Sequence, residues 1–293
     1  MEYESELDAQ SHRIGFIAAL HPKRFIADLA SALNLLWTTR NLAGAMASRE
    51  LRMRYAGQFA GAFWIVGHPV FQMAVYIFIF GVVFQQRIGG TLELPRDYTT
   101  YILSGLVPWL TLSAMLPGLC ASVVGSANLV KQFTFQAEIL VVKDVLIAMV
   151  FWAVGISVIT IYILASYHTL PPTFVLLPVV LALSILFFIG LGWTLSAIGV
   201  FVRDMKDIAV VLVSAGVYVL PIVYLPSWAP ALFRPVIQLN PLSAFIWVYQ
   251  DTLYFGRFEH PYAWIVFALM SLACFGLGYR LFQTLKPSFG KVL

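Results

Sequence analysis

The chain has 293 residues, of which 60% are hydrophobic, and only 18 basic and 14 acidic residues. A soluble domain is about 45–50% apolar, whereas a membrane-spanning helix needs about 20 apolar residues in a row, and this chain supplies several such runs. The net charge of +4 comes from residues that flank apolar runs and form no basic stripe, so nucleic acid is excluded as the expected partner. The sequence therefore predicts an all-α polytopic membrane protein.

Residues 1–61 are predicted to be a cytoplasmic N-terminal segment. They open with acidic residues, not with a basic n-region, so we expect no cleavable signal peptide. Leu35, Leu42, Met46 and Met53 recur on one helical stripe, which predicts an amphipathic helix in the membrane interface. The basic end of this helix would lie among anionic lipid headgroups, where each basic residue contributes about 1 kcal/mol to the free energy of membrane binding. These residues could serve as ordinary membrane anchors or as a binding site for an anionic substrate. These basic residues are Arg49, Arg52 and Arg54.

Six transmembrane helices are predicted in residues 62–293. Their approximate bounds are 62–86, 99–126, 140–166, 172–202, 208–225 and 261–282. Between the last two spans, an uncharged stretch is too short to cross and is interrupted by Asn240–Pro241. It predicts a re-entrant helical hairpin at about 227–256, which is tolerated where protein or water satisfies the broken backbone.

The positive-inside rule supports six spans with both termini in the cytoplasm. In this arrangement only four of the 18 basic residues lie outside. They are Arg87, Arg96, Arg234 and Arg257. A seventh span would move the basic C-terminus to the outer side.

The side chains expected of an ion-driven pump or an ATPase are missing. No charged residue lies centrally in a predicted span, where proton-coupled carriers place carboxylates or histidines. His68, which precedes Pro69, is interpreted as a polar residue at a helix end. The sequence has no G-x-x-x-x-G-K-[ST] phosphate loop, so ATP-driven transport would need a separate hydrolysing subunit.

A metal site and an enzyme active site have weak support. Cys120 and Cys274 lie in apolar runs without metal-ligand spacing, so they are expected to be buried hydrophobic residues, and no metal or disulfide is predicted. The predicted external acids form two separated pairs without a nearby His or Cys ligand set. They are Glu93, Asp97, Asp251 and Glu259.

Aromatic residues line the first predicted span in two patterns. Trp64, Phe71 and Phe78 are seven residues apart, while Tyr76 and Phe80 are four apart. Aromatic rings can pack on the apolar faces of sugars, which favours a conduit for an uncharged polymer. Interfacial belts and ordinary helix packing are the alternative interpretation.

Several motifs occur in an order that resembles the membrane subunit of bacterial ABC-2 type polysaccharide exporters. They are RELRMRY at 49–55, GAFW at 61–64, NLVK at 128–131, EIL at 138–140, PIVY at 221–224 and LNP at 239–241. The chain departs from the usual pattern at Gln136, Ala137 and Val141, where prolines and a basic residue are common. The resemblance covers about residue 45 to the C-terminus.

The resemblance implies a transport subunit of the bacterial inner membrane, with no catalytic activity of its own. Two copies would form a channel at their interface, and two ATP-binding cassette subunits would bind ATP and Mg, so no cofactor is expected on this chain. The substrate would be a lipid-linked glycan such as O antigen, moved from cytoplasm to periplasm. A coupling helix at about 127–139 would contact the ATPases through Asn128, Lys131, Phe133, Phe135 and Glu138.

The resemblance also implies two further sites. Arg49, Arg52, Arg54 and Tyr55 would contact the lipid diphosphate, among surrounding membrane lipids. The periplasmic gate would contain Pro221, Tyr224, Trp228, Asn240 and Pro241. Two alternatives stay open: an ABC-2 exporter of a small lipid or drug, and a polyprenol-linked membrane transferase that works without an ATPase.

Overall fold

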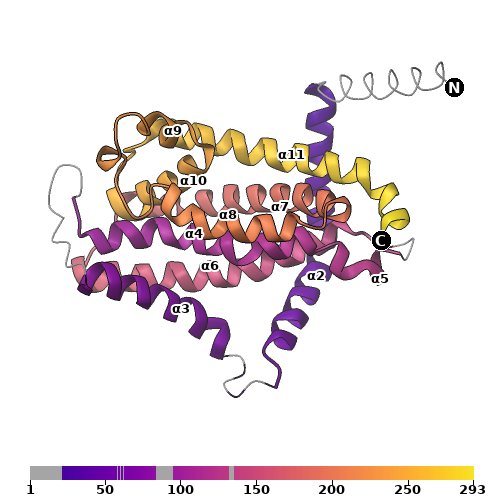
Figure 1. Cartoon of the computed structure of the whole chain (residues 1–293), viewed down its shortest axis with the longest axis horizontal. Coiled ribbons are helices and arrows are strands. Elements are labelled where there is room, and N and C mark those ends of the chain that lie inside the picture. The colour runs from indigo at the N-terminus through magenta and orange to yellow at the C-terminus, as the bar shows by residue number, and fades with distance from the viewer. Residues whose placement is uncertain (1–21, 58, 60, 62, 84–94, 132–134) are drawn as a thin grey trace.

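The computed structural model describes residues 22–57, 59, 61, 63–83, 95–131 and 135–293, and these contain helices but no β-strand. The helices α4, α6, α7, α8 and α11 run alongside one another, while α2 (Pro22–Arg54) crosses this bundle near the end that carries α5 (Ala127–Val130) and the C-terminus (Figure 1). The opposite end carries α9 and α10. The five helices of the bundle are α4 (Tyr98–Ala121), α6 (Glu138–Tyr167), α7 (Leu177–Phe201), α8 (Met205–Val219) and α11 (Pro261–Val292).

Among the described residues, four segments are long and apolar enough to cross a membrane: α4, α6, the segment Pro172–Phe201 that contains α7, and α11. The first predicted span is a 15-residue helix, α3 (Phe63–Ile77), that continues as a π-helix over Phe78–Val83. The fifth is α8, also 15 residues, or about 22 Å at 1.5 Å per residue, which is shorter than a hydrocarbon core of about 30 Å. The four long segments therefore assign the chain to the helical membrane proteins with several spans.

Glycines bring the backbones of α7 and α11 into contact. A Cβ atom added to Gly278 would lie 2.1 Å from the carbonyl oxygen of Gly190, and one added to Gly190 would lie 2.3 Å from that of Cys274. Small residues at helix crossings let membrane helices approach closely. These two glycines therefore set the separation of α7 and α11.

Replacing Gly278 with Ala is expected to lower the thermal unfolding midpoint (Tm) of the purified chain in detergent. The added methyl group must push α11 away from α7, and such overpacking costs about 1–3 kcal/mol. Gly118→Ala is the matched control, because a Cβ atom there meets nothing within 4 Å. Equal Tm values for the two variants would contradict the close crossing.

The helix α2 (Pro22–Arg54), predicted to lie in the membrane interface, packs through small residues. Ala32, Thr39 and Ala43 are buried on the face that contacts α6 and α11. Of the predicted stripe, Leu35 and Met46 pack against the core, while Leu42 and Met53 are exposed. The helix lies close to its neighbours through its smallest side chains, which leaves these two larger ones on outer faces.

At the other end of the bundle, the stretch predicted as a hairpin is a series of short helices. These are η4 (Pro226–Trp228), α9 (Arg234–Leu239), α10 (Pro241–Gln250) and the π-helix η5 (Asp251–Phe255). The helices α9 and α10 are separate because the Asn240 side chain accepts a hydrogen bond from the Leu242 amide at 3.0 Å and Pro241 starts the new helix. The predicted break at Asn240–Pro241 is therefore present. Residues 243–250 of α10 are buried, whereas α9 is mostly exposed.

Candidate functional site

An ion-pair network joins the end of α2 to α6. Glu50 accepts a hydrogen bond from Lys143 of α6 and lies 3.9 Å from Arg54, one turn further along α2. Lys143 also lies 3.1 Å from Asp144. This network holds the predicted headgroup-binding end of α2 against the first turns of α6.

A groove of about 530 Å³ lies beside this network and carries a positive charge. Arg49, Arg54 and Lys143 line it together with Glu50, and Asp144 pairs with Lys143, so basic groups outnumber acidic ones by three to two. Arg49 is exposed, so its guanidinium is accessible from outside the chain. The groove therefore brings together Arg49 and Arg54, two of the residues predicted to contact an anionic headgroup.

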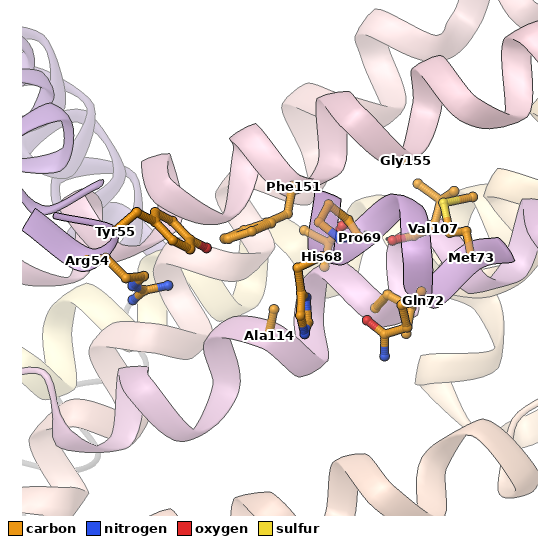
Figure 2. A pocket seen from close by; sticks show the side chains of 12 residues that line it. Arg54, Tyr55, His68, Pro69, Gln72, Met73, Val107, Ala114, Phe151 and Gly155 are labelled. Carbon is orange, nitrogen blue, oxygen red and sulfur yellow. Dashed lines mark hydrogen bonds between the residues drawn. The ribbon is translucent and has the colours of Figure 1, made fainter. Parts of the chain in front are cut away.

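Arg52 and Tyr55, the other two predicted headgroup residues, line a separate and more apolar groove of about 750 Å³ between α2, α3 and α6. Arg54 and Tyr55 also line a smaller cavity of about 260 Å³ that is walled by α3, α4 and α6. Figure 2 shows Tyr55 next to Phe151 of α6, with His68 of α3 nearby. The four predicted residues therefore lie together at one end of α2 but face three different spaces.

The two aromatic patterns of the first span face different ways. Trp64, Phe71 and Phe78 are exposed along α3 and its π-helical continuation, and Phe71 keeps 70% of its surface. Tyr76 instead packs against the core. The side chain of Phe80 lies outside the described residues. Among the described members of the two patterns, those at spacings of seven are therefore the exposed ones.

The predicted coupling segment contains the short helix α5, which covers Ala127–Val130, and it ends where α6 begins at Glu138. Asn128 and Lys131 are exposed and Phe135 is partly exposed, as a docking segment requires. Phe133 lies outside the described residues.

Glu138 does not face outward as predicted. Its side chain is 2% exposed and accepts hydrogen bonds from the Lys286 ammonium at 2.7 and 2.9 Å and from the Gln283 amide at 2.8 Å. A buried carboxylate needs such partners, since leaving it unpaired is costly. Trp193 also donates to the Glu138 carbonyl at 3.2 Å. Glu138 therefore ties the start of α6 to α7 and α11, and the prediction of a direct outside contact is corrected.

Tyrosines of α4 hold the predicted gate segment that follows α8. The Tyr101 hydroxyl lies 3.2 Å from the Pro221 carbonyl and 3.1 Å from that of Tyr224, and it donates its proton to one of them at a time. Gln250 of α10 donates to the same Pro221 carbonyl at 3.0 Å. Trp228 packs with its ring centre 5.8 Å from that of Tyr98. Pro221, Tyr224 and Trp228 are thus held at the start of α4, while Asn240 and Pro241 form the separate α9–α10 break.

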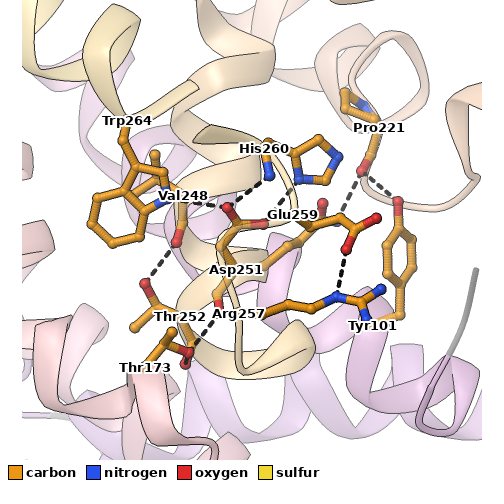
Figure 3. A network of polar contacts seen from close by, with 11 residues as sticks. Tyr101, Thr173, Pro221, Val248, Asp251, Thr252, Arg257, Glu259, His260 and Trp264 are labelled. Carbon is orange, nitrogen blue, oxygen red and sulfur yellow. Dashed lines mark hydrogen bonds and ion pairs between the residues drawn. The ribbon is translucent and has the colours of Figure 1, made fainter. Parts of the chain in front are cut away.

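Asp251 is the centre of a buried polar network at the end of α10 (Figure 3). Its carboxylate accepts from the His260 amide at 3.1 Å, from Trp264 Nε1 at 3.0 Å, and pairs with His260 Nδ1 at 2.9 Å. Thr173 donates to the Asp251 carbonyl at 2.7 Å. The Trp247 ring stacks on the His260 ring at 4.9 Å. These contacts join η5, the loop before α11 and the turn before α7.

The other external acids also have structural partners where they are described. Asp97 caps α4, accepting from the Thr100 amide at 3.0 Å, and it accepts from the Tyr162 hydroxyl at 3.1 Å. Glu259 pairs with Arg257 at 2.6 Å. Across the described parts of the chain, no group of three His, Cys, Asp or Glu side chains is arranged to hold a metal ion. The described partners of Asp97 and Glu259 include a helix N-terminus, a tyrosine hydroxyl and an arginine.

Comparison with known proteins finds one family and several relatives that each match most of the chain. The sequence profile of the family described as ABC-2 type transporter matches residues 41–254. The O-antigen export system permease protein RfbA of Myxococcus xanthus is 25% identical over 260 residues, which cover 87% of this chain and 96% of that protein. A protein of the same description from Klebsiella pneumoniae is 23% identical over 247 residues, covering 84% and 92%. The profile match runs from the second half of α2 into η5, and so includes the groove and the segments predicted to form the coupling helix and the gate.

Proposed function

The chain belongs to the ABC-2 type transporter family, and from that premise we propose that it is the permease subunit of an ATP-driven exporter of a lipid-linked polysaccharide such as O antigen. The observation that carries this proposal is the similarity to O-antigen export permeases over nearly their whole length. The long apolar helices supply the membrane domain that such a subunit needs. Its role is transport, and an ABC ATPase subunit hydrolyses the ATP.

We place the chain in the bacterial inner membrane with six spans and both termini in the cytoplasm. The spans are α3 with its π-helical continuation, α4, α6, α7, α8 and α11. The end of the bundle with α5 and the C-terminus would face the cytoplasm (Figure 1). Arg49 and Arg54 line a groove with Leu129 of α5, so they would lie on the same side, in keeping with the positive-inside rule. The helices α9 and α10 would then form a re-entrant hairpin on the periplasmic side.

Two ATPase subunits would dock on α5 and the residues after it. Asn128, Lys131 and Phe135 are the described side chains available for this contact, and the sequence adds Phe133. ATP and Mg would bind to the ATPases. Because Glu138 follows directly and is tied to α7 and α11, a movement of the docking segment would pass into the membrane helices through it.

Two copies of the chain would enclose the conduit. The exposed aromatic residues of α3, Trp64, Phe71 and Phe78, would offer sugar rings an apolar surface. The segment from Pro221 to Trp228, held by tyrosines of α4, would close its periplasmic exit. The diphosphate of the carrier lipid would bind in the positively charged groove beside Arg49 and Arg54.

Deleting the gene in its native bacterium and restoring it on a plasmid tests the proposed function. We expect the deletion to remove polysaccharide from the cell surface, detected by labelling intact cells, and to leave lipid-linked glycan inside. The plasmid copy should restore the surface label only when the partner ATPase can hydrolyse ATP. Normal surface polysaccharide in the deletion strain would contradict the proposal and favour export of a small lipid or drug.

A further inference from the structure

The cavity of about 260 Å³ next to the charged groove has no role in the function described so far. It is walled by the end of α2 and by α3, α4 and α6 (Figure 2). Arg54 lines both this cavity and the groove of about 530 Å³. A ligand whose phosphate contacts Arg54 in the groove can therefore place the chemical group attached to that phosphate in the cavity while the phosphate keeps its contact with the guanidinium.

The lining of the cavity combines hydrogen-bonding side chains with apolar walls. Tyr55, His68, Gln72 and Thr111 each carry groups that donate or accept hydrogen bonds. The Thr111 hydroxyl donates to the Val107 carbonyl at 2.8 Å, so its oxygen is left as an acceptor. Arg54 is the only charged side chain in the lining.

The remaining walls are apolar, and one of them is aromatic. Phe151 of α6 lies beside Tyr55, and Met73 lies further along the cavity (Figure 2). A sugar ring matches this combination, because it has hydroxyl groups around its edge and apolar C–H faces that pack on aromatic rings. The alkyl chain of a lipid would leave these polar side chains without hydrogen-bond partners, which is unfavourable.

The volume limits the size of the ligand. Pockets for drug-sized ligands span about 300–1,000 Å³, and this cavity lies just below that range. It suits one ring, not an oligosaccharide. The single guanidinium at its edge, where the cavity meets the groove, suits a phosphate attached to that ring.

We propose that the cavity binds the first sugar of the substrate, the one attached to the carrier lipid through its diphosphate, and that Arg54 contacts the phosphate next to that sugar. This inference rests on the proposed function and specifies which part of the substrate the chain recognises. The hydroxyl groups of the sugar ring form hydrogen bonds with the side chains of Gln72, His68 and Tyr55. The rest of the glycan plays no part in this recognition.

Direct binding to the full chain with its partner ATPase in lipid nanodiscs tests this proposal. The three probes are undecaprenyl diphosphate bearing one N-acetylglucosamine, undecaprenyl diphosphate alone, and phosphatidylglycerol. We expect Gln72→Leu to weaken binding of the sugar-bearing lipid about tenfold, as loss of a partly buried hydrogen bond does, and to leave undecaprenyl diphosphate unchanged. Arg54→Gln should weaken both diphosphate lipids to a similar extent.

The same substitution at Gln238, which is exposed on α9 and outside the cavity, is the matched control and should change neither affinity. An unchanged preference for the sugar-bearing lipid in Gln72→Leu would overturn the proposal. Binding of phosphatidylglycerol as tight as that of the sugar-bearing lipid would also overturn it, since the site would then hold an ordinary phospholipid headgroup. Neither result changes the outcome of the gene-deletion experiment, which tests export itself. The proposed function and this binding site can therefore fail independently of each other.

Discussion

Replacing Lys286 with Met is expected to lower the Tm of the purified chain by several degrees and to reduce the amount of folded chain in the membrane. The substitution leaves the Glu138 carboxylate buried with only Gln283 as a side-chain partner. Breaking a buried ion pair costs about 3–5 kcal/mol, and we expect about 3 kcal/mol because Lys286 keeps 33% of its side chain exposed. Unfolding followed by size-exclusion chromatography in detergent measures the shift.

Two further variants separate the ion pair from other effects of the substitution. Lys291→Met changes the same residue type in the last turn of α11, where the side chain is exposed, and should leave the Tm unchanged. The double variant Glu138→Met/Lys286→Met should recover most of the lost stability, since an apolar pair of similar volume has no unpaired buried charge. A double variant less stable than Lys286→Met alone would show that the network does not act as described.

Replacing Asp251 with Ala is expected to have an effect at least as large at the opposite end of the bundle. The change removes the acceptor of the His260 amide, of Trp264 Nε1 and of the His260 ring. Each buried donor left without a partner costs about 1–3 kcal/mol, so we expect a loss of about 3 kcal/mol or more. Because these contacts hold the loop before α11, the folded chain should also become sensitive to proteolysis near residues 256–260.

Asp251→Asn is the informative comparison for this site. The amide oxygen can still accept from the His260 backbone and Trp264, while its NH₂ group can donate to His260 Nδ1 in the tautomer that carries its proton on Nε2. We therefore expect a smaller loss than for Ala. Asp204→Ala, at an exposed position whose side chain makes no cap hydrogen bond, is the control. An Ala variant as stable as this control would contradict the structural role of Asp251.

Local sequence signals predicted the helical elements well. Long uncharged runs located α4, α6, α7 and α11 to within a few residues at most ends, because an apolar run of about 20 residues is typical of a membrane-spanning helix. The separation of α9 from α10 was also predictable, since Asn caps a helix and Pro starts one. The C-terminal extension of α11 to Val292 was not, because its last turns are more polar than a membrane span and are held through contacts such as Lys286 with Glu138.

The surroundings of individual side chains were harder to predict. Glu138 lies next to exposed coupling residues in the sequence, but its partners Gln283 and Lys286 lie 145 and 148 residues further along the chain. The packed face of α2 was missed because Ala32 and Ala43 contribute little to a pattern based on large apolar residues. His68 was interpreted as a polar residue near a helix end, and it is exposed in the second turn of α3. The sequence did not indicate that it also lines a cavity with residues of α2, α4 and α6.

Transport by the reconstituted complex tests the central claim most directly. The chain and its partner ATPase would be inserted into liposomes with lipid-linked polysaccharide, and delivery of the glycan across the bilayer would be followed by its protection from an added glycan hydrolase. We predict protection that requires ATP, both subunits and a hydrolysis-competent ATPase. Protection without ATP, or none with a complex that hydrolyses ATP in response to the lipid-linked glycan, would contradict the account.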